Sequence, residues 1–158
     1  IIADELAGSS ASSPIVEEFD ELAERGLGCA ANLSVGRIAE ILRQDPRHPD
    51  PPKNWKADSH YRLPLQGAES LLEAGQRVAA HLNSRMAGLP DGSLKLFVGH
   101  GAAFRHAAYH LGVLEFAQIA RLSMFHGHPV FLEYQTPGVW CHIAGDWKMR
   151  DKNSRFMD

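Results

Sequence analysis

One short segment combines an imidazole with the chain geometry that would present it to an anion. Residues 94–98 predict a short apolar strand, and Gly99-His100-Gly101 ends it just before a helix expected from 102 to 111. In open α/β sheets, ligands bind beyond the carboxyl ends of the strands, and the first N–H groups of a following helix are unpaired and partly positive. The pattern therefore predicts an anion site at His100.

The chemistry available at this junction is hydrogen bonding or proton transfer to an oxyanion. The two flanking glycines let a ligand approach the backbone closely, and the imidazole of His100 can donate to a phosphoryl oxygen or titrate near neutral pH. The alternative is a histidine that packs at a strand end and donates to a carbonyl. The junction alone leaves both interpretations open.

A carboxylate and a guanidinium are adjacent in a glycine-bounded turn at residues 22–28. Glu24 and Arg25 could supply a proton donor and an anion clamp together, although an exposed surface ion pair would have the same sequence. A third segment, Gly67-Ala68-Glu69-Ser70, comes before a helix that Ser70 is expected to cap. Glu69 either supports the site or is solvated.

Helices that alternate with isolated strands must position these residues. We expect helices at about 35–45, 71–87, 102–111 and 115–122, and strands at 15–16, 94–98, 129–134 and 139–143. Five of the nine prolines lie in residues 45–64, which predicts a long irregular loop or lid. The pattern predicts an α/β class with a three-layer α/β/α arrangement, in one domain that spans residues 1–158. Residues 1–6 resemble the last turns of a helix already under way, so we expect the natural beginning to be missing.

Composition excludes several classes of function. The 158 residues carry a formal net charge of −3, so a basic nucleic-acid footprint is absent, and no apolar run is long enough to span a membrane. The two cysteines cannot form a disulfide framework, which fits a reducing, cytoplasmic location. We expect neither a nucleic acid nor a membrane as a partner, and pairing of two copies as a homodimer is left open.

The order of the motifs resembles the histidine phosphatase superfamily, and most of all the branch that includes cofactor-dependent phosphoglycerate mutases. The chain has L-x-E-R-x-x-G at residues 22–28, G-x-E-S at 67–70, V-G-H-G-x-x-x-R at 98–105 and a proline-containing strand near 125–134. The resemblance implies a phosphomonoester hydrolase or, alternatively, a mutase that acts through a phosphohistidine. It implies that His100 hydrogen-bonds the transferring phosphoryl group and that Glu24 donates a proton to the leaving oxygen. Arg25 and the Gly101 backbone would contact the anion.

The sequence departs from this family in one important respect. The family's nucleophilic histidine lies in an Arg-His-Gly motif after the first strand, and residues 1–158 contain no such motif. His106 follows an arginine but falls inside a predicted helix, and His48 lies in the proline-rich loop, so neither is expected to be the nucleophile. Either the sequence lacks this segment or the chain is a relative without a nucleophile, a phospho-ligand-binding pseudophosphatase. We expect the first, because losing a central strand would leave backbone groups unpaired.

Other features bear on substrate and cofactor. Leu27 and Ala102 stand where mutases of the family often carry Tyr or a polar residue, which favours a phosphatase. His126 and His128 could bind a metal with another histidine, but no cysteine or carboxylate lies at ligand spacing, so we expect neither a metal nor a cofactor. The expected ligand is a small phosphorylated substrate. The loop at 45–64 is the candidate for substrate selection, through its mixed polar and aromatic side chains (Lys53, Trp55, His60 and Arg62).

Overall fold

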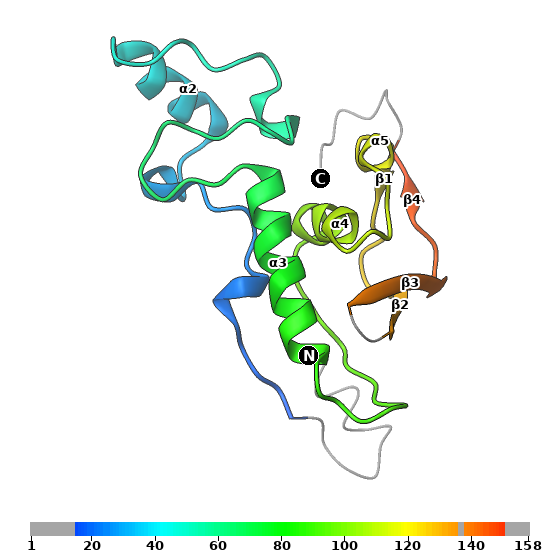
Figure 1. The fold of residues 1–158 in the computed structure, drawn as a ribbon. Helices are drawn as coiled ribbons and strands as arrows, with labels where there is room; N and C mark the ends of the chain where they lie inside the picture. The colour runs from blue at the N-terminus through cyan, green and yellow to red at the C-terminus, as the bar shows by residue number, and fades with distance from the viewer. Residues whose placement is uncertain (1–14, 136–137, 151–158) are drawn as a thin grey trace.

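Mixed helices and small sheets make up the fold, consistent with the expected α/β class (Figure 1). The computed structural model describes residues 15–135 and 138–150, and the elements below lie within these ranges. The helices are α2 (Val35–Gln44), α3 (Leu71–Met86), α4 (Gly101–His110) and α5 (Phe116–Ile119), with 3₁₀ turns η1 (Asp20–Leu22), η2 (Gly28–Ala30) and η3 (Trp55–Ala57). The strands are β1 (Leu122–Ser123), β2 (Phe131–Gln135), β3 (Val139–Ala144) and β4 (Lys148–Met149).

Two helix starts follow the capping residues that the sequence predicts. The Ser34 hydroxyl accepts a hydrogen bond from the Arg37 N–H at 3.2 Å at the start of α2. At the start of α3, Ser70 Oγ accepts from the Glu73 N–H at 3.1 Å and Glu73 Oε2 accepts from the Ser70 N–H at 2.7 Å. Both predicted caps are confirmed, and the second is a complete capping box.

Helices α3 and α4 pack against one another and form the larger apolar core. Gly75 on α3 allows the close approach, because a Cβ there would lie 2.4 Å from the Cβ of His106 on α4. Trp140 on β3 closes this core, and its indole N–H donates to Asn83 Oδ1 at 2.7 Å. The buried members of the core are Val78, Ala79, Leu82, Ala103, Ala107, Leu111 and Trp140.

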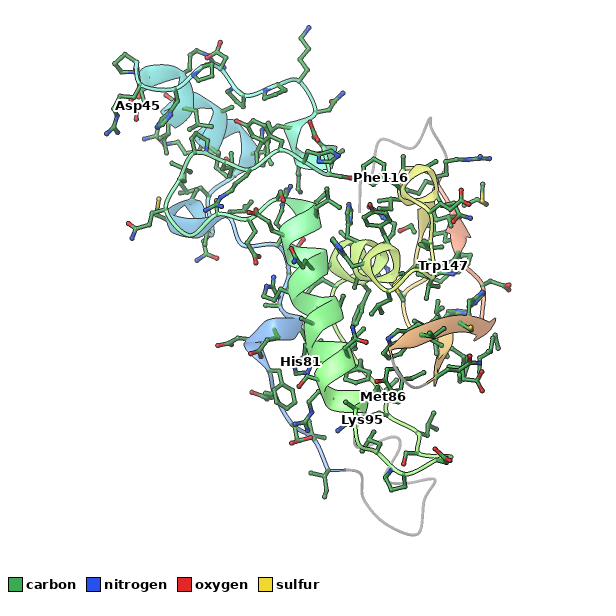
Figure 2. The ribbon with its side chains drawn as sticks, viewed as in Figure 1. Asp45, His81, Met86, Lys95, Phe116 and Trp147 are labelled. Atoms are coloured by element: carbon green, nitrogen blue, oxygen red, sulfur yellow. The ribbon has the colours of Figure 1, made fainter. Side chains whose placement is uncertain are left out.

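A second apolar cluster joins α2 to the long loop at residues 45–64 and the segment that follows it. Figure 2 draws the side chains of these segments in the same view as Figure 1. Trp55 in η3 is only 5% exposed, so this part of the loop is fixed by packing rather than by regular structure. The buried members are Ala30, Ile38, Leu42, Trp55, Leu63 and Ala68.

The strands form two separate antiparallel pairs. β2 pairs with β3, and β1 pairs with β4. The strands predicted at 129–134 and 139–143 are confirmed as β2 and β3, with ends shifted by one or two residues. Thr136 and Pro137 of the predicted Pro-Gly turn lie outside the described residues.

Three predicted elements differ from the structure. Residues 94–98 and 15–16 form no strand, because no described segment pairs with them, and Leu94 and Ile15 are about nine-tenths exposed (89% and 92%). The helix predicted at 115–122 is limited to Phe116–Ile119, because Leu122 already pairs with β4. The helix predicted at residues 1–6 lies outside the described part of the chain. Among the described residues, no helix is long and apolar enough to cross a membrane.

Candidate functional site

Two of the sequence motifs lie side by side and are joined through their backbones. The Glu69 N–H donates to the Gly26 carbonyl at 2.8 Å, and Leu27 forms an isolated antiparallel bridge with Ala68. Gly28 has a φ of +60°, and a Cβ there would lie 2.1 Å from the Gln66 carbonyl. Glycine is therefore required at residue 28. The close approach of the two backbones at this point places residues 22–28 against residues 66–69.

His100, from the motif at residues 98–105, lies close to Glu24, from the motif at residues 22–28. Nδ1 of His100 lies 3.8 Å from Oε2 of Glu24, close enough for an ion pair when the imidazole is protonated. The two side chains are 54% and 65% exposed, so a ligand in solvent can reach both. This arrangement places a hydrogen-bonding imidazole next to a carboxylate that could transfer a proton.

A pocket with mainly cationic walls lies next to this pair. Its lining residues are Glu24, Arg25, Lys56, Ala57, Leu71, Ala102, Arg105 and Arg150. Four of the eight are basic and one is acidic, so the pocket has the charge to hold a phosphate or carboxylate group. The walls come from the first motif, η3, the starts of α3 and α4, and the chain just after β4.

Arg25 lies at the wall of this pocket in a partly desolvated position. Its guanidinium carbon is 5.6 Å from the centroid of the Trp55 ring, within cation–π range. Burial lowers the pKa of Arg25 below its ordinary value, and the neighbouring Glu24 carboxylate opposes that change. The guanidinium stays charged at neutral pH, so it is suited to contact an anion.

His100 and Gly101 border the pocket without lining it. His100 is the N-cap of α4 in extended conformation, and its side chain makes no capping hydrogen bond, so the imidazole is available to a ligand. Gly101 begins α4, and Ala102 one residue later lines the pocket. The helix therefore starts at the pocket and contributes its partial positive charge there.

Three basic lining residues escaped the sequence reasoning. Arg105 was present in the motif at 98–105, and it lies one helical turn after Gly101, so helical spacing could have found it. Its Nη1 donates to the Leu122 carbonyl at 2.8 Å. No sequence motif marks Lys56 or Arg150 as a site residue, because only the tertiary fold brings them to the pocket.

The proline-rich loop contributes differently from the expectation. Of the residues singled out there, Trp55 has the Arg25 guanidinium over its ring. Arg62 pairs with Glu73 at 3.1 Å, and His60 packs on Phe116. None of these lines the pocket, and neither does Lys53. Lys56 and Ala57 of the same loop do.

His106, which follows Arg105 in the sequence, is a buried structural residue and not a candidate nucleophile, as predicted. His106 is fully buried (0% exposed), and its Nδ1 donates to the Ala102 carbonyl at 2.7 Å, so Nε2 accepts from the Ser59 hydroxyl at 3.0 Å. Burial lowers its pKa from 6.5 to about 4. Within the described ranges, no group of three or more His, Cys, Asp or Glu side chains is arranged to hold a metal ion.

Comparison with known proteins identifies the family. Residues 3–146 match the model of the histidine phosphatase superfamily (branch 1), which covers most of the chain, and the chain therefore belongs to this superfamily. Searches of curated proteins and of solved structures gave no match. The family connects the chain with phosphoryl transfer or hydrolysis through a phosphohistidine.

Proposed function

We propose that this protein hydrolyses small phosphomonoesters without a metal, through a phosphohistidine on a histidine outside residues 1–158. In this proposal His100 hydrogen-bonds the transferring phosphoryl group and Glu24 is the proton donor. The observation that carries it is the 3.8 Å separation between His100 and Glu24 at the border of a cationic pocket.

The proposed reaction has two steps, each balanced in protons. In the first, the nucleophilic imidazole attacks phosphorus, the ester P–O bond breaks, and Glu24 gives its proton to the leaving oxygen. In the second, water attacks the phosphohistidine, Glu24 takes a proton from the water, and the P–N bond breaks to release phosphate. His100 would neutralise charge on the phosphoryl oxygens in both steps.

The remaining roles belong to the anion contacts. Arg25 would clamp the anion, supported by its position at the pocket wall, and the Gly101 N–H at the start of α4 would donate to an oxygen. Arg105 would add a further charge from the same helix. A three-layer α/β/α arrangement is part of this proposal, supported by the family membership and the mixed helices and strands.

Two alternatives use the same site. One is a pseudophosphatase that binds a phosphorylated ligand and does not turn it over, which would also account for the absence of an Arg-His-Gly motif from residues 1–158. Mutase transfer would need the same histidine and carboxylate, but Leu27 and Ala102 favour hydrolysis.

A binding experiment and a turnover experiment separate these functions. Inorganic phosphate is titrated calorimetrically into the chain and into the His100→Ala variant, and we expect the variant to bind roughly tenfold more weakly, the effect of one charge-assisted hydrogen bond. The matched control is His48→Ala, because His48 lies beside Asp45 at 3.9 Å and does not line the pocket. An equal loss in both variants contradicts the proposed site.

Turnover of p-nitrophenyl phosphate is then measured, with and without chelator, for this chain and for the protein with any residues encoded before Ile1. Turnover that resists chelation and is lost in His100→Ala supports the hydrolase. Phosphate binding without turnover in either protein supports the pseudophosphatase, and activity abolished by the chelator would contradict the metal-free mechanism.

A further inference from the structure

Glu24 and Arg25 line the pocket, and an ion pair outside the pocket binds the backbone beside them. The pair is Arg77 on α3 and Glu69 just before α3, and their side chains are about three-quarters buried. Arg77 Nε donates to Glu69 Oε1 at 2.9 Å and Nη2 donates to Glu69 Oε2 at 2.8 Å. This is a bidentate contact, the geometry in which arginine and a carboxylate bind most specifically.

The rest of the Arg77 guanidinium is used on the segment that carries Glu24. It donates to four backbone carbonyl oxygens, two of them in η1 and two just after it: those of Asp20 (3.3 Å), Glu21 (2.7 Å), Ala23 (3.2 Å) and Glu24 (3.3 Å). No other side chain type has five N–H donors in a planar fork, so lysine could not make this set of contacts.

Glu69 completes the arrangement on the other side of the same two residues. Its Oε2 accepts a hydrogen bond from the Gly26 N–H at 2.9 Å, and its own N–H donates to the Gly26 carbonyl at 2.8 Å. The hydrogen bond to Arg77 lowers the pKa of Glu69, more than burial raises it, and the same contact raises the pKa of Arg77. Both groups are therefore charged at neutral pH, and the pair persists under the conditions in which a phosphate would bind.

We propose that Arg77 and Glu69 are positioning residues that set where Glu24 and Arg25 stand in the pocket. The proposal rests on the proposed function only for its effect on ligand binding. Arg77 fixes the carbonyl of Glu24, and Glu69 fixes Gly26, so the two pocket side chains lie between two fixed points. Neither positioning residue lines the pocket, and thus neither touches a ligand there.

The chain offers a matched control on the same helix. Arg85 lies near the end of α3 and ties the same N-terminal segment to the helix, through an ion pair with Glu17 and a cation–π contact with Phe19 at 4.7 Å. It makes no contact with residues 20–26 among the interactions of the described residues. Arg85→Lys therefore weakens a tether of this segment without affecting the two fixed points beside Glu24.

The experiment compares Arg77→Lys, Glu69→Gln and Arg85→Lys in two measurements. The first is the ¹⁵N-NMR indole resonance of Trp55, assigned with Trp55→Phe, because Arg25 lies over that ring at 5.6 Å. We expect Arg77→Lys and Glu69→Gln to shift this resonance and Arg85→Lys to leave it in place. The second is the affinity for inorganic phosphate, which we expect to fall roughly tenfold in the first two variants and less than twofold in the control.

Rescue separates positioning from general stability. Arg77→Ala with added guanidinium chloride, at concentrations far below those that unfold the protein, is expected to recover the wild-type Trp55 resonance, and Arg85→Ala is not. An unshifted resonance in both Arg77→Lys and Glu69→Gln overturns the proposal, and so does an equal shift in Arg85→Lys. If the unmodified chain binds no phosphate, the proposed function fails, and the Trp55 resonance still decides the positioning role.

Discussion

Gly75 on α3 lies directly against His106 on α4. A Cβ at residue 75 would be 2.4 Å from the Cβ of His106 and 2.6 Å from its carbonyl carbon. The second of these atoms is backbone and cannot move aside without shifting α4. Since His100 is the N-cap of α4 and Ala102 in its first turn lines the pocket, this one contact couples the packing of the helices to the geometry of the site.

Gly75→Ala should therefore destabilise the protein by about 2 kcal/mol or more, although alanine is the better helix former. Gly36→Ala is the control, because nothing lies within 4 Å of a Cβ at that position near the start of α2. It should stabilise the protein by about 0.5 kcal/mol through helix propensity. Urea unfolding followed by circular dichroism measures both, and a Gly75→Ala protein as stable as the parent would contradict the close approach.

Local rules predicted a large part of this fold. The caps at Ser34 and Ser70 depend on residues three positions apart, so the sequence carries all the information they need. The short apolar run at 94–98 was a weaker guide, because a strand forms only where a second strand supplies its hydrogen-bond partners. Leu94, Leu96 and Val98 are all more than half exposed in the described structure.

From the sequence, only the site residues that belong to a recognisable motif could be predicted. The resemblance implied that Glu24 and His100 act on the same phosphoryl group, and in the structure His100 Nδ1 lies 3.8 Å from Glu24 Oε2. Nothing in the sequence indicated the role of Arg77, because its partners besides Glu69 are backbone carbonyls far away in the sequence, and any residue type offers a carbonyl. Arg150 likewise reaches the pocket only through the tertiary fold.

The buried imidazole of His106 should make stability depend on pH. Its pKa is about 4 in the folded protein against 6.5 when unfolded, so between these values the unfolded chain binds more protons. Stability is then highest above pH 6.5 and falls by about 3 kcal/mol as the pH drops to about 4, below which this contribution stays constant.

Urea unfolding between pH 4 and 8 measures this dependence, and His106→Gln should remove most of it. His126→Gln is the control, because His126 is exposed and lies outside α4. A parent protein whose stability is flat over this range would show that His106 is accessible to protons in the folded state.

Removing the charge of Glu24 should separate binding from catalysis. Glu24 is the acidic residue in a pocket lined by four basic ones, so Glu24→Gln should bind inorganic phosphate roughly threefold to tenfold more tightly at low salt. Hydrolysis, where present, should fall by about 10² to 10⁴, the usual contribution of a general acid. Calorimetry and the p-nitrophenyl phosphate assay check the two effects, with Glu18→Gln, exposed and outside the pocket lining, as the control. Weaker phosphate binding in Glu24→Gln would mean that the carboxylate orders the site rather than repelling the anion.

Two lysines of the proline-rich loop allow a test of substrate selection with little change in structure. Lys56 lines the pocket and Lys53, three residues earlier, is exposed and does not. Lys56→Met keeps most of the side-chain length and removes the charge, so affinity for inorganic phosphate and for phosphomonoesters should fall about fivefold at low salt, and by less as salt screens the charge. Lys53→Met should leave affinity unchanged at every salt concentration. Equal losses in the two variants would mean that the loop acts through its overall charge. A loss confined to Lys56→Met would mean that the loop contacts the ligand's charge through this lysine. Its two neighbours cannot do so, since Trp55 is buried and Ala57 carries no charge.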